Sequence, residues 1–345
     1  RVRLLDARDR IGGRLISPPG GRTFDFGACW TWPSHDHELA AVCAAVGAQT
    51  VAQWSKGDML TVSSDGRVHR VASRAFSEER RFVGGSASLV QRLLDKAKAP
   101  VSTGHAVSRV SIAEGGELLE VHACRSADGL PVVLHARAVV VAAPPPVVAS
   151  TIAFEPPLPA QLAHALANTP VWMSDAAKVV VTFPSPFWRA AGLSGSASSA
   201  RGPVRQWWDN TDPEMRGATD DDASASLAGF ALDDDARQLA AGGAQAVEMI
   251  DRIVEQLLQL FGEQASQPLA VHYCAWPGEE WTADPSGRTE RAPPIFGAGI
   301  LRRPPAEYGG RLIFSGTETE EEHGHMEGAV ISGKRAARAL CELLD

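Results

Sequence analysis

The stretch Leu5–Arg14, with the sequence LDARDRIGGR, decides the fold class of this 345-residue chain. Its apolar start predicts the end of a short β-strand, and the charged residues that follow mark the exit from that strand. An acidic residue in this place, such as Asp6, can accept hydrogen bonds from the ribose hydroxyls of an adenine dinucleotide. Gly12 and Gly13 let the backbone approach a phosphate closely, and Arg14 can supply positive charge. A tight turn with a solvated arginine fits the same residues.

The C-terminal part of the chain carries the second informative pattern. Leu312–Ser315 predicts a strand, Gly316–Thr319 a turn, and Met326–Leu344 a terminal helix. The N-terminus of such a helix offers free backbone N–H groups and a positive dipole end, which suit an anionic ring such as a reduced flavin. An ordinary terminal helix that starts after a glycine fits the same residues.

Together these segments resemble the flavin-containing amine oxidase, or monoamine oxidase-like, family. The resemblance is carried by Leu5–Arg14, Phe314–Thr319 and Met326–Ala329, in the family's order. Further matching pieces lie between them: Asp25–Ala28, Gly84–Gly85, the run into Ala142–Pro144, and Phe154–Pro159. The resemblance covers most of the chain. The short stretch between Gln49 and Gly84 is typical of a compact member.

The resemblance implies an α/β fold in which an FAD-binding Rossmann-like domain is joined to a substrate domain of mixed sheet and helices. The FAD-binding domain is expected to be discontinuous, with residues 1–50, 84–150 and 300–345. The substrate domain is expected to contain residues 51–83 and 151–299.

The resemblance also implies a set of cofactor-binding residues. Asp6 would hold the adenosine ribose, and Arg14 the pyrophosphate. Val107 would hold the adenine through its backbone, and Glu318 the ribityl or phosphate side. The remaining cofactor-binding positions would be Gly12, Gly13, Gly27, Ala28, Gly316 and Met326, with Gly27 and Ala28 beside the flavin ring.

Three residues are candidates for the reaction site. Lys178 resembles the family lysine that holds a water against flavin N5, although a solvated lysine at a strand end fits the sequence too. Trp276 resembles an aromatic residue packed near the flavin, although a core tryptophan would look the same. His325 stands where the family has the tyrosine of Gly-Tyr-Met, so the family's two-tyrosine amine cage is incomplete. Its imidazole could hydrogen-bond a polar substrate or act as a base, or it could be a packed histidine that caps the helix.

Two further departures from the family pattern affect the cofactor. The family begins with a strand and a G-x-G-x-x-G loop that seats the pyrophosphate, and this sequence starts after the place of that unit. We expect either a fragment or a separate piece of roughly 30 residues, about one βα unit. Trp281–Gly299 has no counterpart of the cysteine that anchors flavin in monoamine oxidases. Any FAD is therefore expected to be noncovalent.

The reaction implied by the resemblance is FAD-dependent oxidation of an amine C–N bond. Hydride would pass from the α-carbon to flavin N5, and dioxygen would be reduced to hydrogen peroxide. Two alternatives remain open at this point. One is a desaturase or protoporphyrinogen oxidase-like dehydrogenase on a similar scaffold, and the other is a flavin-free degenerate homologue.

Composition excludes several classes of partner. The chain has 33 Lys+Arg against 41 Asp+Glu, which gives a net charge of -8 and predicts no nucleic-acid partner. Its five cysteines are scattered and lack C-x-x-C spacing, which favours a reducing cytoplasm. The apolar run Ala138–Ala149 is cut by prolines far short of the ~20 residues that span a bilayer. No metal-ligand pattern is predicted, and the oligomeric state is not readable.

The middle of the chain predicts several elements that can be compared with the structure. Val179–Phe183 predicts a strand, and Glu117–Ala136 a β-hairpin around an Asp-Gly turn. Gly192–Gly202 and Gly217–Ser226 are rich in small polar residues and predict surface loops. A helical stripe is expected to face the core at these positions: Val247, Ile250, Val254, Leu257, Leu258 and Phe261.

Overall fold

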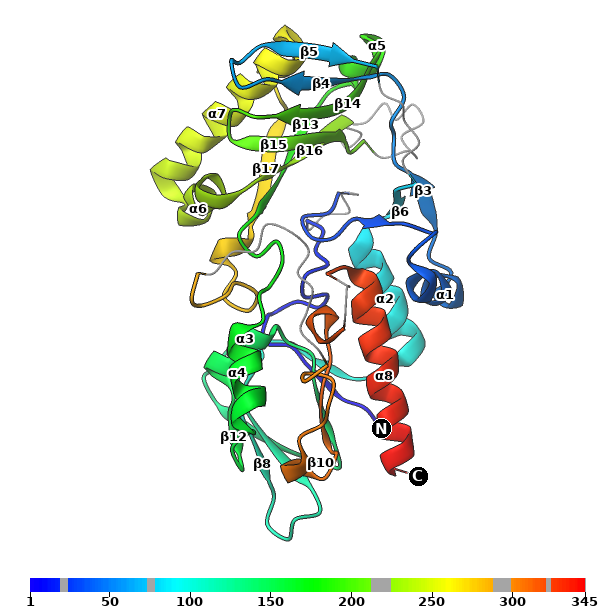
Figure 1. Cartoon of the computed structure of the whole chain (residues 1–345), viewed down its shortest axis with the longest axis vertical. Coiled ribbons are helices and arrows are strands. Elements are labelled where there is room, and N and C mark those ends of the chain that lie inside the picture. Colours follow the sequence, from blue (N-terminus) through cyan, green and yellow to red (C-terminus); the bar gives the residue numbers. More distant parts are fainter. Residues whose placement is uncertain (19–23, 73–77, 212–224, 288–298, 321–323, 345) are drawn as a thin grey trace.

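The fold is described from a computed structural model, which covers residues 1–18, 24–72, 78–211, 225–287, 299–320 and 324–344. It is an elongated α/β arrangement with a large sheet at one end and a smaller sheet at the other (Figure 1). The predicted α/β class is thereby confirmed, whereas the predicted domain boundaries stay a prediction. Among the described residues, no helix has the length and apolar character needed to cross a bilayer.

The two end segments of the chain form short parallel strand pairs. β1 (Leu4–Leu5) pairs with β7 (Val101–Ser102), and β11 (Val139–Val141) pairs with β18 (Leu312–Phe314). The predicted strands at these ends are therefore confirmed. Three helices lie beside these pairs, and α1 packs against both of the others: α1 (His37–Val46), α2 (Ser86–Ala97) and α8 (Met326–Leu344).

A four-stranded sheet occupies the end of the molecule opposite the large sheet (Figure 1). Its strands lie in the order β10 (Pro131–Ala136), β9 (Leu119–Arg125), β8 (His105–Ile112) and β12 (Ala153–Glu155). β9 and β10 are antiparallel, which confirms the predicted hairpin. Two helices, α3 (Pro145–Thr151) and α4 (Ala160–Asn168), pack together next to this four-stranded sheet. Tyr308 is buried in the same region, and its O–H donates to Pro156 O at 2.7 Å.

The large sheet has seven strands and contains the main hydrophobic core. Its strands lie in the order β17 (Ala270–Ala275), β13 (Ala177–Phe183), β16 (Ala225–Ala231), β15 (Val204–Asp209), β14 (Leu193–Ser199), β4 (Asp58–Val62) and β5 (Val68–Val71). The helices that cover one face are α6 (Asp233–Ala241) and α7 (Gly243–Phe261), with the short α5 (Phe187–Ala190) at the end of β13. Every residue of β13 is buried, and the predicted strand over Val179–Phe183 is confirmed.

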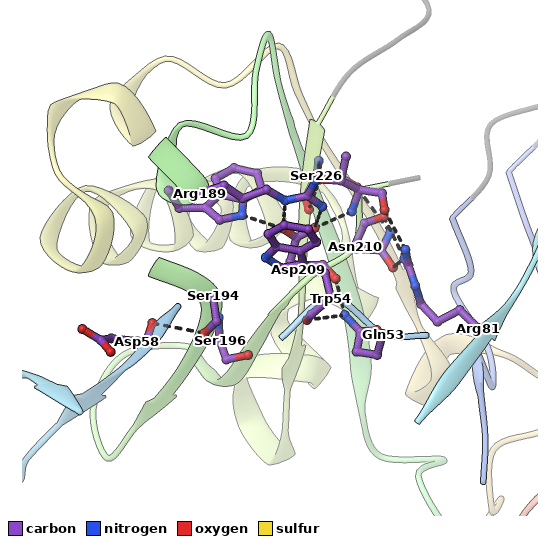
Figure 2. A network of polar contacts seen from close by, with 12 residues as sticks. Gln53, Trp54, Asp58, Arg81, Arg189, Ser194, Ser196, Asp209, Asn210 and Ser226 are labelled. Carbon is purple, nitrogen blue, oxygen red and sulfur yellow. Dashed lines mark hydrogen bonds and ion pairs between the residues drawn. The ribbon is translucent and has the colours of Figure 1, made fainter. Parts of the chain in front are cut away.

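A small sheet and a polar network join the large sheet to the rest of the molecule. β6 (Arg80–Phe82) lies between β2 (Trp30–Thr31) and β3 (Thr50–Ala52). Figure 2 shows the network at the end of β15, where the Asp209 carboxylate accepts bonds from Arg189 Nε at 2.6 Å and Trp188 Nε1 at 2.7 Å. The Arg81 guanidinium donates to Asn210 O at 2.8 Å, so β6 is tied to the same strand end.

Of two predictions for the large-sheet region, one is wrong and the other is confirmed in part. Gly192–Gly202 was predicted as a surface loop, but most of it forms the largely buried strand β14, which pairs with β15 and β4. In α7 the predicted Leu257 is buried and Phe261 packs against the core, whereas Val247 is 60% exposed. The buried face also contains Met249, Ile253 and Leu260, which were not predicted. Most of Gly217–Ser226 lies outside the described residues.

Candidate functional site

The glycine turn after β1 is built as the sequence predicts. Asp6 ends the strand, its backbone N–H donates to Ser102 O at 3.0 Å, and its carboxylate accepts the Arg8 N–H at 2.9 Å. Gly12 has a φ of 95°, and a Cβ there would lie 2.4 Å from Leu15 O. Only glycine fits this position, so the turn presents bare backbone beside Asp6.

Arg14 joins the two ends of the chain. Its guanidinium forms a two-bond ion pair with the Glu318 carboxylate, with Nη2 to Oε2 at 3.0 Å. Glu318 is only 2% exposed. Burial disfavours the charged guanidinium, but the charge and hydrogen bond of Glu318 outweigh burial and raise the pKa of Arg14. Gly316, which has a φ of 126°, fixes the turn before Glu318 by donating its N–H to Ser332 Oγ at 2.9 Å.

Two arginine side chains beside the glycine turn share the Glu279 carboxylate. Arg8 Nε lies 3.2 Å from Glu279 Oε2, and Arg10 Nη2 lies 3.8 Å from the same oxygen. Arg10 Nη1 donates to Gly13 O at 2.8 Å, but Nη2 is buried and has no hydrogen-bond acceptor within the described chain. Burial and the charge of Arg8 lower the pKa of Arg10. Two guanidinium groups that share one carboxylate favour an anionic ligand.

Lys178 is buried rather than solvated. It lies in β13 and is 3% exposed, so the interpretation of a solvated lysine at a strand end is wrong. Its Nζ donates to Gly27 O and to Cys29 Sγ, the latter at 3.2 Å. The same atom lies 5.6 Å from the ring centre of Trp208 and 5.4 Å from that of Phe230. Burial raises the pKa of the Cys29 thiol, which therefore accepts this bond as a neutral group.

The segment that carries Gly27 and Ala28 is held on both sides. Asp25 accepts the backbone N–H of Ser86, the first residue of α2, at 2.8 Å, and burial raises the pKa of this carboxylate. Trp276 is buried, and its indole N–H donates to Phe26 O at 3.1 Å. Trp276 therefore presents only its ring to other partners.

Gly27 connects the glycine-turn region with the lysine region. A Cβ at Gly27 would lie 1.7 Å from Arg14 O, so any larger residue would push the two segments apart. Its carbonyl oxygen meanwhile accepts the Lys178 bond. Gly27 thus brings Arg14, a predicted cofactor-binding residue, and Lys178, a predicted catalytic residue, to opposite sides of one glycine.

His325 lies among aromatic rings just before α8. Its ring centre is 5.3 Å from that of Trp32 and 4.9 Å from that of Trp172. A row of rings continues from Trp32 to Trp30 at 6.4 Å and from Trp30 to Trp208 at 4.7 Å. Because Trp208 also faces Lys178, this row connects His325 with the lysine.

The residues at the start of α8 have structural partners. Met326 is buried in a cluster with Leu39 of α1. The neighbouring Glu327 accepts the backbone N–H groups of Glu38 at 2.8 Å and Leu39 at 2.6 Å, and so caps α1.

Val107 lies in β8, two residues after His105, whose N–H donates to Asp6 O at 2.9 Å. Val107 is therefore at the glycine-turn end of the site, away from Lys178.

Sequence reasoning missed the residues that surround Lys178. Cys29 and Trp208 are far from Lys178 in the sequence and match no motif, and neither does Phe230. The signal that finds Phe230 is strand register, because Lys178 of β13 is directly opposite Phe230 of β16. That register becomes known only once the strands are paired.

Comparisons with known proteins find one matching family. The profile of the family described as "Flavin containing amine oxidoreductase" matches residues 1–79 and 68–341. The chain is 29% identical to amine oxidase [flavin-containing] B of Sus scrofa over 321 residues, which is 90% of this chain and 57% of that protein. It is 28% identical to putrescine oxidase of Kocuria rosea over 288 residues, which is 81% of this chain and 56% of that protein. The chain thus spans little more than half the length of these relatives.

Solved structures show the same fold. An engineered triple mutant of putrescine oxidase matches with a TM-score of 0.79 at 21% identity, covering 98% of this chain and 93% of the other. Cyclohexylamine oxidase from Brevibacterium oxydans matches with a TM-score of 0.76 at 20% identity, covering 99% and 93%. At such identities the likeness concerns the fold alone.

Proposed function

Because this chain belongs to the flavin-containing amine oxidoreductase family, we propose that it oxidises a C–N bond of a small-molecule amine with noncovalent FAD. The observation that carries the proposal is the buried Lys178 ammonium, which is held against Gly27 at the meeting point of the two end motifs. A buried cation without a carboxylate within ion-pair distance in the described chain is costly, which makes Lys178 a candidate for a functional role.

The residues around the glycine turn fit a dinucleotide. Asp6 offers a carboxylate at a strand end, which suits ribose hydroxyls. Arg10 has a buried Nη2 without an acceptor in the described part of the chain, which suits a phosphate oxygen. Arg14 is anchored by Glu318 and keeps its charge. Bound FAD would supply the acceptor for the hydride of the amine α-carbon, and dioxygen would then receive the electrons to give hydrogen peroxide.

The chain's own residues would orient the amine and keep it uncharged. The rings of Trp208 and Phe230 pack beside Lys178, which is 3% exposed, and Trp30 packs against both rings. A protonated amine is disfavoured there, because like charges repel strongly in a buried site. The amine would therefore bind with its nitrogen lone pair free, as oxidation of the adjacent carbon requires.

The test is amine-dependent formation of hydrogen peroxide by the purified protein supplied with FAD, measured over a panel of primary amines. We expect at least one amine to give peroxide, and Lys178→Met to lower the rate roughly 10-fold or more, by analogy with the loss of one preorganised donor. Lys96→Met is the matched control, because Lys96 is exposed and its ammonium donates to Ala45 O on the protein surface. Equal rates in both variants would remove Lys178 from the reaction.

A reducing cytoplasm remains the proposed compartment. Its support is that all five cysteines are described and free: Cys29, Cys43, Cys124, Cys274 and Cys341.

A further inference from the structure

The three-stranded sheet places three side chains against the end of β15. β2 supplies Trp30, β6 supplies Arg81, and Gln53 follows β3 directly. They contact three consecutive residues at the end of β15: Trp208, Asp209 and Asn210. The three-stranded sheet is therefore docked on the part of the large sheet that carries Trp208, whose ring lies beside Lys178.

The side-chain amide of Gln53 ties Trp30 to this strand end. Gln53 is 7% exposed, and its Oε1 accepts the indole N–H of Trp30 at 3.1 Å. Its Nε2 donates to Asp209 O at 2.6 Å and to Trp54 O at 3.3 Å (Figure 2). A reversed amide would turn its N–H groups toward the indole N–H and its oxygen toward two carbonyl oxygens. The partners of Gln53 therefore determine the orientation of its amide.

Trp30 in turn holds Trp208 by ring packing. The ring centre of Trp208 lies 4.7 Å from that of Trp30 and 4.8 Å from that of Phe230. The Trp208 indole N–H has no hydrogen-bond partner among the described residues, so packing positions this ring. Trp208 and Phe230 are the rings that face Lys178 Nζ, at 5.6 Å and 5.4 Å. The bond between Trp30 and Gln53 is therefore a polar anchor for the rings beside Lys178.

We propose that Gln53 is a positioning residue of the amine site, because it orients Trp30 and thereby keeps the aromatic rings beside Lys178 in one arrangement. The proposal rests on the proposed function, which places the amine at those rings. The hydrogen bonds of Lys178 itself go to Gly27 and Cys29, so Gln53 acts on the site through Trp30. An amine must present its α-carbon to the hydride acceptor, and displaced positioning groups slow such a step strongly.

Gln256 provides a matched control at the opposite end of the same strand. It lies in α7, is 6% exposed, and is bonded to Val204, the first residue of β15. Its Oε1 accepts the Val204 N–H at 3.1 Å, and its Nε2 donates to Val204 O at 2.8 Å and to Arg201 O at 3.0 Å. Both glutamines hold β15 with a buried amide, but the Gln53 amide also bonds an indole. Methionine at either position removes the amide and keeps a chain of similar length.

Indole N–H resonances of the 15N-labelled, FAD-free protein test the positioning without any turnover. Trp30→Phe and Trp208→Phe assign the two signals. We expect Gln53→Met to move the Trp208 signal as well as that of Trp30, because the two rings are displaced together, and Gln256→Met to leave both in place. Trp30→Phe, which breaks the same bond from the ring side, should also move the Trp208 signal. A Trp208 signal that neither Gln53→Met nor Trp30→Phe moves would overturn the proposal.

A double-mutant cycle links this hydrogen bond to the reaction, with rates measured per bound FAD on the amine that the wild type oxidises fastest. Gln53→Met and Trp30→Phe are each expected to lower kcat/KM about 10-fold, and the double variant no further, because both changes remove the same bond. Gln256→Met is expected to lower the urea midpoint and to leave kcat/KM unchanged. Losses that multiply in the double variant, or a loss of kcat/KM in Gln256→Met as large as in Gln53→Met, would overturn the proposal.

Failure of the proposed function gives a different result from failure of the positioning role. A wild type that oxidises no amine would remove the proposed function, and the indole signals would still decide whether Gln53 fixes the rings. Amine oxidation that is equally fast in the wild type and in Gln53→Met would overturn the role of Gln53 and leave the proposed function intact.

Discussion

Arg14 is a half-buried cation and Lys178 a buried one, and the molecule holds them in opposite ways. Arg14 has a two-bond ion pair with the Glu318 carboxylate. Lys178 has a carbonyl oxygen, a thiol and two aromatic rings, and the described residues place no carboxylate within ion-pair distance. The ion pair satisfies the charge of Arg14 within the fold, whereas the described residues offer Lys178 no such counter-charge. This difference supports the proposal that the lysine end is the reactive end of the site.

The largest loss of stability is expected at the ion pair between Asp209 and Arg189, whose carboxylate is fully buried. Asp209 has 0% exposure and takes two bonds from Arg189, so Asp209→Asn should lower the free energy of unfolding by about 3 kcal/mol. Urea denaturation measures this change. Asp234→Asn, which breaks an exposed pair with Arg237, should leave the urea midpoint in place. Equal shifts in the two variants would show that burial does not decide the strength of these pairs.

A smaller loss is expected at the Arg14 pair. Arg14→Met leaves the buried Glu318 carboxylate without its main partner, and the loss should be about 2 kcal/mol because the Arg14 side chain is 33% exposed. The same variant should retain less FAD after desalting. Stability and FAD content equal to those of the wild type would place Arg14 outside both the fold and the cofactor site.

Lys178→Met should behave differently from Arg14→Met. Replacing an unpaired buried ammonium by an apolar chain of similar length removes a desolvation cost, so stability should rise or change by less than about 1 kcal/mol. Urea denaturation of the FAD-free protein tests this, with Lys96→Met as the control. A loss of stability as large as that of Arg14→Met would mean that Lys178 is structural and that the two cations contribute to the fold in the same way.

Asp25 makes stability depend on pH in a predictable direction. Burial raises its pKa in the folded state, although Lys178 acts to lower it. The folded state therefore binds a proton more tightly than the unfolded state, and this stabilisation is lost as pH rises above the ordinary carboxylate range near 4. Relative to Asp25→Asn, the wild type should lose stability between about pH 4 and neutrality. A difference that stays constant over this range would contradict the assignment.

The smallest predicted effect is on the reactivity of the Cys274 thiol, whose pKa depends in part on the charge of Lys178. Burial and the charge of Glu279 raise the pKa of Cys274 to about 11, while Lys178, which lies opposite it in the sheet, acts to lower it. Lys178→Met should therefore slow alkylation of Cys274 at pH 8 by roughly a few-fold, because less thiolate is present. Mass spectrometry of the modified peptides measures the rate, with the exposed Cys124 and Cys341 as internal controls. An unchanged Cys274 rate would mean that the ammonium is uncharged or displaced.

The sequence predicts the end motifs well because they are local. The strand before Asp6, the turn at Gly12 and the helix that begins at Met326 each depend on adjacent residues, and all three are present. The pairing of Arg14 with Glu318 was not predicted, since 304 residues separate them and the resemblance implies a cofactor contact for each.

The surroundings of Lys178 were not predictable in the same way. Cys29 is 149 residues from Lys178, and only the folded sheet brings the thiol to the ammonium. The strand β14 was mistaken for a loop because its small residues are typical of turns. Its pairing with β15 and β4 on either side depends on the tertiary fold and is not visible in the local sequence. The buried face of α7 was predicted only in part for the same reason. The strands that pack against the helix decide which of its residues are buried.

The most direct test of the central claim is a visible absorbance spectrum of the protein incubated with FAD and desalted, followed by anaerobic addition of an amine. We expect flavin bands to survive desalting and then to bleach with the amine, rapidly in the wild type and slowly in Lys178→Met. Bands that survive but bleach equally fast in both proteins, or with no amine of the panel, would contradict the claim that the lysine end is the site of amine oxidation.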